Sequence, residues 1–150
     1  MNDRFKFRVW SEDYNLYIED NCYPIGSDFN LSMTQNGYVE VIGMGDYDDD
    51  GAFSWGTVES LKECIGDYTV EQCTGLRDKN GKLIYEGDLI KEPANKHNLE
   101  VFYENGAWQT REYRKNGNRE QLLYVLINCY GVEVIGNIHE NADLIKVGGK

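Results

Sequence analysis

The sequence lacks every feature that would assign the chain to a membrane, to the secretory pathway or to a common class of enzyme. Its longest apolar runs are only a few residues, far short of the roughly 20 that span a bilayer. The opening residues, MNDRFKFRVW, contain no apolar signal core. A nucleotide-binding glycine fingerprint, a phosphate loop and a pair of catalytic carboxylates are also missing. We therefore expect a cytoplasmic protein that is not an enzyme, holds no cofactor and does not enter a membrane.

Cysteine and histidine are scarce and poorly placed for a metal site. Four cysteines and two histidines are present, and no two cysteines form a CxxC pair. Because structural zinc sites use closely spaced thiolates or Cys/His pairs, this spacing argues against zinc. In a reducing cytoplasm we expect the cysteines to be small buried hydrophobic residues: Cys22, Cys64, Cys73 and Cys129. We expect His97 to be exposed in a polar loop and His139 to lie at the surface or at a strand edge.

Excess negative charge is confined to the first half of the chain. The net charge is −11. Residues 1–76 contain four basic and fifteen acidic side chains, whereas residues 77–150 contain eleven of each, so the halves carry −11 and zero. A field of this sign repels phosphates at long range, which disfavours nucleic acid as a partner. It favours solubility and, beyond that, a basic protein partner.

The stretch TGLRDKNGKLIYEGDLI, from Thr74 to Ile90, predicts a hairpin. One tight turn lies at Asp78 to Gly81 and another at Gly87-Asp88, and the residues between them have strand composition. The whole chain is 41% hydrophobic and contains 11 Tyr, 5 Phe and 3 Trp. Such a composition favours one core built mainly from strands.

Apolar alternation and turn residues predict the remaining elements. We expect strands near residues 4–10, 14–18, 38–42, 69–73, 89–91, 99–103, 108–113 and 132–138, with tight turns at Asn36-Gly37 and Asn105-Gly106 and an irregular segment from Pro24 to Asn30. A short helix is expected from a cap at Thr57 to a stop at Gly66. Arg119 to Leu126 fits either a helix or a buried strand, and we favour the helix. Asn141 is expected to cap a closing turn through Leu144.

Three blocks of the sequence resemble the YopX family. They are FKFRVW (Phe5 to Trp10), TVEQCTGLRDKNGKLIYEGDLI (Thr69 to Ile90) and VIGNIHENADLI (Val134 to Ile145), in the order that the family has them. The segments between the blocks show no such likeness, and Ala142 stands where the family often has proline. The family comprises small proteins of bacterial phages and prophages, mostly in Gram-positive hosts. The resemblance implies a compact β-rich protein without an established activity, and it supplies no catalytic residue.

Basic and aromatic residues interleave once, in the charge-neutral half. A surface made from these residues could bind a peptide or stack nucleic-acid bases; alternatively, the rings pack inward and the arginines lie in a solvated loop. The candidate binding residues are Tyr103, Trp108, Arg111, Tyr113, Arg114 and Arg119. Nucleic-acid binding through this stripe is therefore an alternative function.

Aspartates at alternate positions precede Gly51 and resemble a calcium loop. Asp46, Asp48 and Asp50 could wrap oxygen ligands around a hard cation. Thr57, however, stands where a bidentate glutamate should close the loop, which favours a solvated acidic turn. Divalent-metal binding is the second alternative function.

We conclude from the sequence that the chain is a β-rich α+β protein. A smaller, acidic amino-terminal subdomain (about residues 1–73) is expected beside a carboxy-terminal SH3-like β-barrel (about residues 74–150). The expected function is that of a phage or prophage accessory protein that binds a host or phage protein. Strand edges and the surplus of aromatic residues also favour a homo-oligomer.

Overall fold

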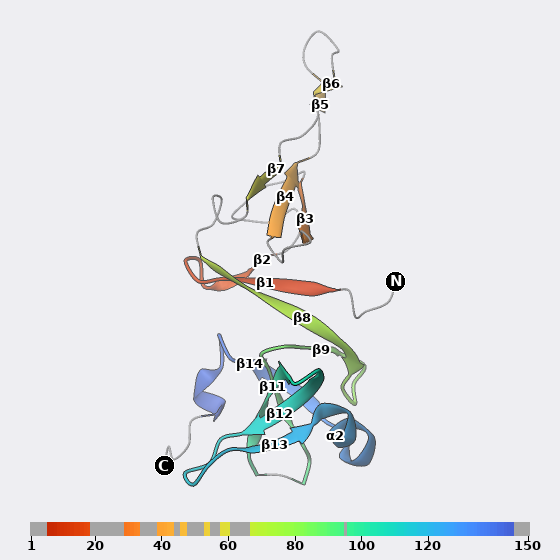
Figure 1. Cartoon of the computed structure of the whole chain (residues 1–150), viewed down its shortest axis with the longest axis vertical. Coiled ribbons are helices and arrows are strands. Elements are labelled where there is room, and N and C mark those ends of the chain that lie inside the picture. Colours follow the sequence, from red (N-terminus) through yellow and green to blue (C-terminus); the bar gives the residue numbers. More distant parts are fainter. Residues whose placement is uncertain are drawn as a thin grey trace. The chain divides into compact units, whose positions relative to one another are not determined.

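The fold is given by a computed structural model, which describes residues 6–18, 67–94 and 96–145 together with the backbone of five short strands. These five strands are β3 (Phe29–Met33), β4 (Val39–Gly43), β5 (Asp46–Tyr47), β6 (Phe53–Ser54) and β7 (Val58–Ser60). The chain forms two compact units (Figure 1). The C-terminal unit comprises Met1–Phe7 and Glu71–Lys150, and the N-terminal unit comprises Arg8–Val70.

An antiparallel sheet that curves into a half-barrel is the centre of the C-terminal unit (Figure 1). Its spatial order is β13-β12-β11-β10-β14. The strands are β10 (Asp88–Lys91), β11 (Asn98–Glu104), β12 (Ala107–Glu112), β13 (Arg119–Leu122) and β14 (Glu133–Asn137). Helix α2 (Leu123–Tyr130) follows β13 directly, and a 3-10 turn, η2 (Ala142–Ile145), follows β14. The expectation of a β-rich fold with little helix is confirmed.

The hairpin predicted at the centre of the sequence is present. The long strand β8 (Tyr68–Arg77) pairs antiparallel with β9 (Leu83–Tyr85) in the C-terminal unit. Asp78 closes the turn: its Oδ1 accepts the backbone N–H groups of Asn80 and Lys82 at 2.8 and 2.9 Å. Its Oδ2 accepts the N–H of Val134 at 3.0 Å and so joins the turn to β14. Burial opposes ionisation, but these three N–H donors and the Lys82 charge outweigh it, so the pKa of Asp78 is lowered.

At the second predicted turn, the backbone of Gly87 lies very close to the side chain of Glu71. Gly87 has φ of +78°, a conformation that favours glycine. Its N–H donates to the carbonyl of Val101, and its own carbonyl accepts the N–H of Ile138. A Cβ at this position would lie 2.5 Å from Oε1 of the buried Glu71. Gly87 is therefore hydrogen-bonded to β11 and to the residue after the end of β14, and the side chain of Glu71 from β8 packs against it.

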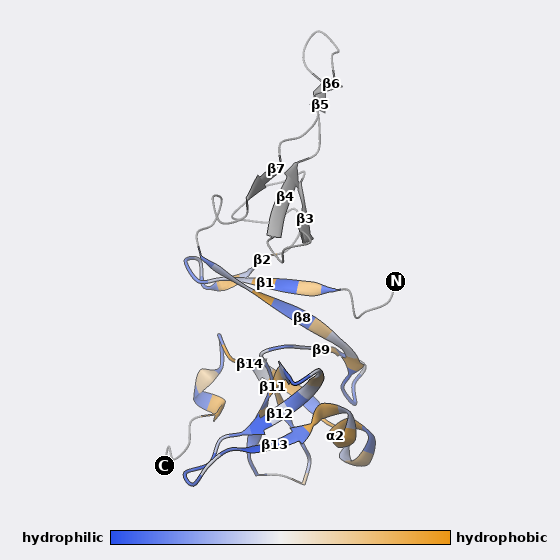
Figure 2. Ribbon diagram, viewed as in Figure 1, coloured by the Kyte–Doolittle hydropathy of each residue, from blue (hydrophilic) through white to orange (hydrophobic). Residues whose placement is uncertain are grey.

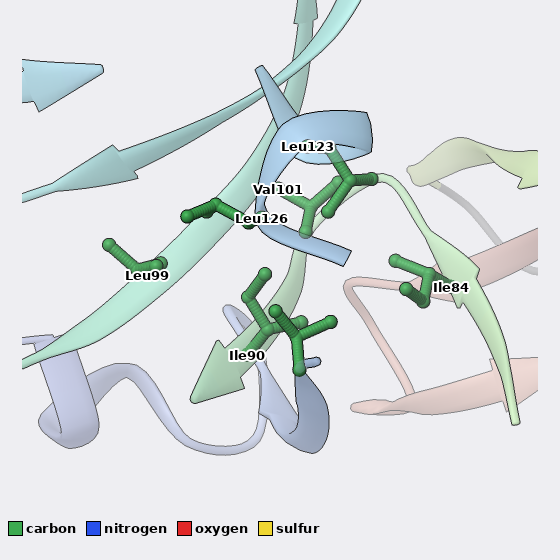
Figure 3. Packing of buried hydrophobic residues seen from close by; sticks show 7 residues of the cluster. Ile84, Ile90, Leu99, Val101, Leu123 and Leu126 are labelled. Atoms are coloured by element: carbon green, nitrogen blue, oxygen red, sulfur yellow. The ribbon is translucent and has the colours of Figure 1, made fainter. Parts of the chain in front are cut away.

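One face of the sheet and the inner side of α2 enclose the core. Alternation along β11 buries Leu99 and Val101 and directs the residues between them to the opposite face. Figure 3 shows these side chains gathered below the helix. The cluster consists of Ile84, Ile90, Leu99, Val101, Leu123, Leu126 and Val132.

The N-terminal unit contains the predicted first hairpin. Strand β1 (Phe7–Ser11) pairs antiparallel with β2 (Leu16–Ile18), with Trp10 opposite Tyr17. Their rings meet edge to face at 5.0 Å, and the Arg8 guanidinium lies 4.6 Å from the centre of the Tyr17 ring. Strands β3, β4 and β7 form a second antiparallel sheet, and β5 pairs with β6. The strands flanking Asn36-Gly37 are as predicted, while the turn itself lies outside the described residues.

Three predicted boundaries are wrong. Val58–Ser60 is strand β7, paired with β4, where the first turn of a helix capped by Thr57 was expected; residues 61–66 lie outside the described part. The expected irregular segment ends earlier, because Phe29 already belongs to β3. The expected helix from Arg119 begins only at Leu123, since Arg119–Leu122 pairs with β12 as strand β13. In the first and third cases cross-strand pairing overrides local helical spacing.

Candidate protein-binding surface

The sheet divides the predicted stripe of basic and aromatic residues between its two faces. Trp108 packs against the core cluster on the same face as Thr110, whereas Arg111 projects from the opposite face. Tyr103, at the end of the hairpin, is 54% exposed and meets Trp108 edge to face at 5.0 Å. The stripe is therefore not one continuous surface.

Arg111 is held in place by a carboxylate and a ring. Its Nε donates to Glu120 at 2.8 Å, and its guanidinium lies 4.0 Å from the centre of the Phe102 ring. The hydrogen bond to Glu120 raises the pKa of Arg111. On the same face, the Tyr113 hydroxyl donates to Glu100. Burial and then the Glu100 carboxylate raise the pKa of Tyr113.

Arg114 and Arg119 also have polar partners. Arg114 makes a bidentate pair with Glu112, with Nε and Nη2 each 2.7 Å from a carboxylate oxygen. Glu112 itself is buried, and the Nε2 of the exposed His97 lies 3.9 Å from its Oε1. With the Gln121 amide oxygen turned toward it, Arg119 donates to that oxygen at 2.9 and 3.0 Å. The charges of Arg111 and Arg114 are thus offset by carboxylates, so these contacts do not favour nucleic-acid binding, which stays a prediction.

The aspartate loop falls mainly outside the described residues. Asp46 belongs to β5, where it pairs with Ser54 of β6, and Asp48 and Asp50 lie outside the described part. Among the residues that the structure describes, no group of three His, Cys, Asp or Glu side chains could hold a metal ion. Metal binding by these aspartates therefore stays a prediction.

His139 was expected at the surface or at a strand edge; it follows the edge strand β14, but its side chain is mostly buried. Its side chain is 13% exposed, and its Nε2 lies 2.8 Å from Oε1 of Glu71. Glu71 comes from β8, 68 positions earlier, so no local pattern could have revealed the pair. Nearby, burial raises the pKa of Glu86, and the charges of Glu71 and Glu100 act in the same direction. The pair connects the end of β14 to β8, which is a structural role.

Helix α2 presents the most distinctive surface of the C-terminal unit. Leu123 and Leu126 face the core, while Tyr124, Val125 and Tyr130 are 66%, 41% and 57% exposed. None of its eight residues, LYVLINCY, carries a charge, and Figure 2 colours much of the helix as hydrophobic. The α2 face is defined by Leu122, Tyr124, Val125 and Cys129, all of which are exposed. Tyr130, the last residue of the helix, projects on the side of Leu123 and Leu126 and is exposed only because the helix ends there.

The one amide side chain on this helix is bonded to the helix itself. The Asn128 side chain donates to the Tyr124 carbonyl at 2.7 Å, within the helix. The α2 face therefore offers an uncharged surface of one tyrosine, aliphatic groups and a thiol to a neighbour. Cys129 is exposed, contrary to the expectation that the cysteines are buried; Cys73 is buried as expected, and Cys22 and Cys64 lie outside the described residues. Sequence reasoning missed this surface, although the signal was there: a helix without a charged residue, with large side chains on more than one side, cannot bury every side against one sheet.

Comparisons with known proteins agree on the fold. Residues 6–146 match the family described as YopX protein. A solved structure of protein EF1440 from Enterococcus faecalis is 23% identical, covers 94% of this chain and 97% of its own, and superposes with a TM-score of 0.57. The solved structure of protein yopX from Bacillus subtilis is 19% identical, covers 97% and 100%, and has a TM-score of 0.52. At these identities the likeness shows the fold alone. No curated protein matches the chain.

Within the described residues, no helix has both the length and the apolar character needed to cross a membrane.

Proposed function

This chain belongs to the YopX family, and from that premise we propose that it acts by binding a protein and catalyses no reaction itself. Its place would be the cytoplasm of a bacterial host, as an accessory protein of a phage or prophage. The partner would be a host or phage protein. We also propose that the half-barrel of β10 to β14 is the SH3-like part expected from the sequence.

The observation that carries the proposal is the exposed, uncharged α2 face. Surface helices normally carry polar residues on the side that faces water, because only the inner side is covered. Here the water-facing side of the helix carries Tyr124, Val125 and Cys129, all exposed, with Asn128 bonded back to the helix. Contiguous apolar surface of this kind marks interaction sites in soluble proteins. Tyrosine is also one of the residues that contribute most to binding at protein interfaces.

The buried polar residues of the described part are engaged within the fold. Every buried side-chain nitrogen or oxygen there has a hydrogen-bond partner. The buried carboxylates are engaged as well, Glu112 with Arg114 and Glu71 with His139. Such contacts stabilise the fold, because buried polar groups without a partner would be costly.

A matched pair of substitutions tests the proposal. Val125 is 41% exposed on α2, and Leu144 is 39% exposed on η2, which lies well apart from α2 in Figure 1. Both residues can be replaced by lysine without disturbing the core, and lysine is a better helix former than valine. We expect tagged wild-type and Leu144→Lys chains to capture the same protein from bacteria that carry the prophage, and Val125→Lys to lose it. Equal capture by all three chains, or no capture by any, would refute a role for the α2 face.

A further inference from the structure

Asn-Gly pairs are a chemically labile feature of this chain that protein binding does not use. The sequence contains four of them, at Asn36, Asn80, Asn105 and Asn116, and the first lies outside the described residues. In such a pair the backbone nitrogen of the glycine can attack the asparagine side chain, because glycine has no side chain to obstruct it. The attack needs rotation of the asparagine backbone, so a pair that the fold holds firmly resists it.

From the local structure we infer that Asn116 is a site of spontaneous deamidation, with water as the co-reactant. Base removes the proton from the backbone nitrogen of Gly117, and this nitrogen bonds to Cγ of Asn116. The bond from Cγ to the side-chain nitrogen breaks, and ammonia leaves with a proton from the solvent. Water then opens the five-membered imide at either carbonyl and gives aspartate or isoaspartate. Residues 77–150, with eleven basic and eleven acidic side chains, thereby gain one net negative charge.

The loop that contains Asn116 is open to solvent and weakly held. It joins β12 to β13, and residues 114–118 are all exposed. The N–H of Gly117 donates to the Arg114 carbonyl at 3.4 Å, longer than the roughly 2.7–3.2 Å of a normal hydrogen bond. A Cβ at Gly117 would meet no atom within 4 Å, so the space beside this glycine is empty. The attacking nitrogen is therefore accessible to base and free to move.

Positive charge around Asn116 favours loss of the proton from this nitrogen. Residues 113–119 contain three basic and no acidic side chains. Glu112 offsets the charge of Arg114, whereas Arg119 donates to a neutral side-chain amide and Lys115 is exposed. A neighbouring cation stabilises an anion that forms beside it. The nitrogen anion that attacks Cγ is therefore easier to form here than beside a carboxylate.

Hydrogen bonds protect the pair at Asn80. The N–H of Gly81 donates to the Asp78 carbonyl at 3.0 Å, so the attacking nitrogen is already engaged. Oδ1 of Asp78 accepts the N–H groups of Asn80 and Lys82 at 2.8 and 2.9 Å. Rotation of the Asn80 backbone would break these bonds, and we expect a slow reaction.

Strand pairing protects the pair at Asn105. Asn105 and Gly106 have φ of +53° and +79° and form the turn between Glu104 and Ala107, which pair across β11 and β12. Rotation of the Asn105 backbone would disrupt the end of this hairpin. The adjacent carboxylate of Glu104 also disfavours a nitrogen anion. We expect this pair, too, to react slowly.

Peptide mass spectrometry of the full chain, incubated at mildly alkaline pH, tests the inference. In the folded chain we expect deamidation at Asn116 to be several-fold faster than at Asn80 or Asn105. In guanidinium chloride the three rates should converge, since the protection of the other two pairs depends on the fold. Circular dichroism shows whether each sample is folded throughout.

A matched control identifies the reactive residue, because Asn118 lies in the same loop. The deamidated loop peptide should disappear in Asn116→Ser and persist in Asn118→Ser. Equal rates at the three pairs of the folded chain, or a folded chain in which Asn116 stays intact while the unfolded chain reacts, would overturn the inference. Loss of the product in Asn118→Ser alone would overturn the assignment to Asn116. These outcomes are independent of the proposed function, because no partner enters the assay.

Discussion

Replacing Gly87 by alanine should destabilise the C-terminal unit far more than the same change at Gly106. The two glycines have nearly equal backbone angles, with φ of +78° and +79°. An alanine at either position would adopt a left-handed backbone conformation, which costs about 1–2 kcal/mol. A Cβ at Gly106 would meet no atom within 4 Å, whereas at Gly87 it would lie 2.5 Å from Glu71 Oε1 and 3.3 Å from Ile138 Cδ1.

The clash at Gly87 is not relieved by a simple side-chain movement. A glutamate at the surface would swing away, but Glu71 is buried and lies 2.8 Å from Nε2 of His139. Displacing its carboxylate loses a hydrogen bond between charged or polar partners, worth about 1.5–3 kcal/mol. Adding the backbone strain, we expect Gly87→Ala to lower the free energy of unfolding by about 2.5–5 kcal/mol.

Urea unfolding of the two variants, followed by circular dichroism, measures the difference directly. Gly106→Ala is the control for backbone strain alone and should cost about 1–2 kcal/mol. Equal losses of stability in the two variants would show that Glu71 moves freely, and the reasoning about the buried Glu71–His139 pair would be refuted.

Further predictions concern single carboxylates and the arginines. The pKa of Asp78 is lowered in the folded state, so its contribution to stability is present above its unfolded pKa of about 3.9 and disappears as the pH falls through the folded value. Asp78→Ala should therefore cost stability at pH 7 and little at strongly acidic pH, as measured by urea unfolding; a loss independent of pH would contradict this. The pKa of Glu86 is raised, so ionisation of this residue opposes folding as the pH rises through its folded value. Glu86→Gln should stabilise the chain at pH 7 and have almost no effect at pH 4, and an effect that grows toward acid would have the wrong sign. Since Arg111 and Arg114 are paired with carboxylates, we expect no retention of the chain by DNA or RNA at physiological salt in a filter-binding assay. Binding that falls steeply with salt and disappears in the triple alanine variant of these two residues and Arg119 would instead support the nucleic-acid alternative.

The parts of the fold that could be predicted are those encoded by neighbouring residues. Asp78 to Gly81 and Asn105-Gly106 specify tight turns through their own backbone preferences, and the structure has both turns. Alternation along residues 99–103 likewise shows which side chains enter the core. Local chemistry decides these features, so the sequence is sufficient to find them.

The features that escaped prediction depend on distant partners. Arg119–Leu122 has helical spacing, but pairing with β12 makes it a strand. Nothing near His139 in the sequence indicates that it is buried, because its partner, Glu71 of β8, is distant in the chain. The sequence predicted no carboxylate partner for the arginines of the stripe. The register between β12 and β13 places Glu120 opposite Arg111. Asn141 was expected to cap the closing turn, yet its side chain accepts the N–H of Asn137 instead.

The central claim, that another protein covers the α2 face, can be tested most directly by the reactivity of Cys129. An uncharged maleimide would be applied to intact bacteria that express the chain and to the purified chain at high dilution. A cysteine introduced by Leu144→Cys on η2 serves as the reference for access of the reagent. We expect alkylation of Cys129, relative to this reference, to be several-fold slower in cells than in dilute solution. The same ratio in both would mean that the α2 face is open to solvent in the cell, and would contradict the account.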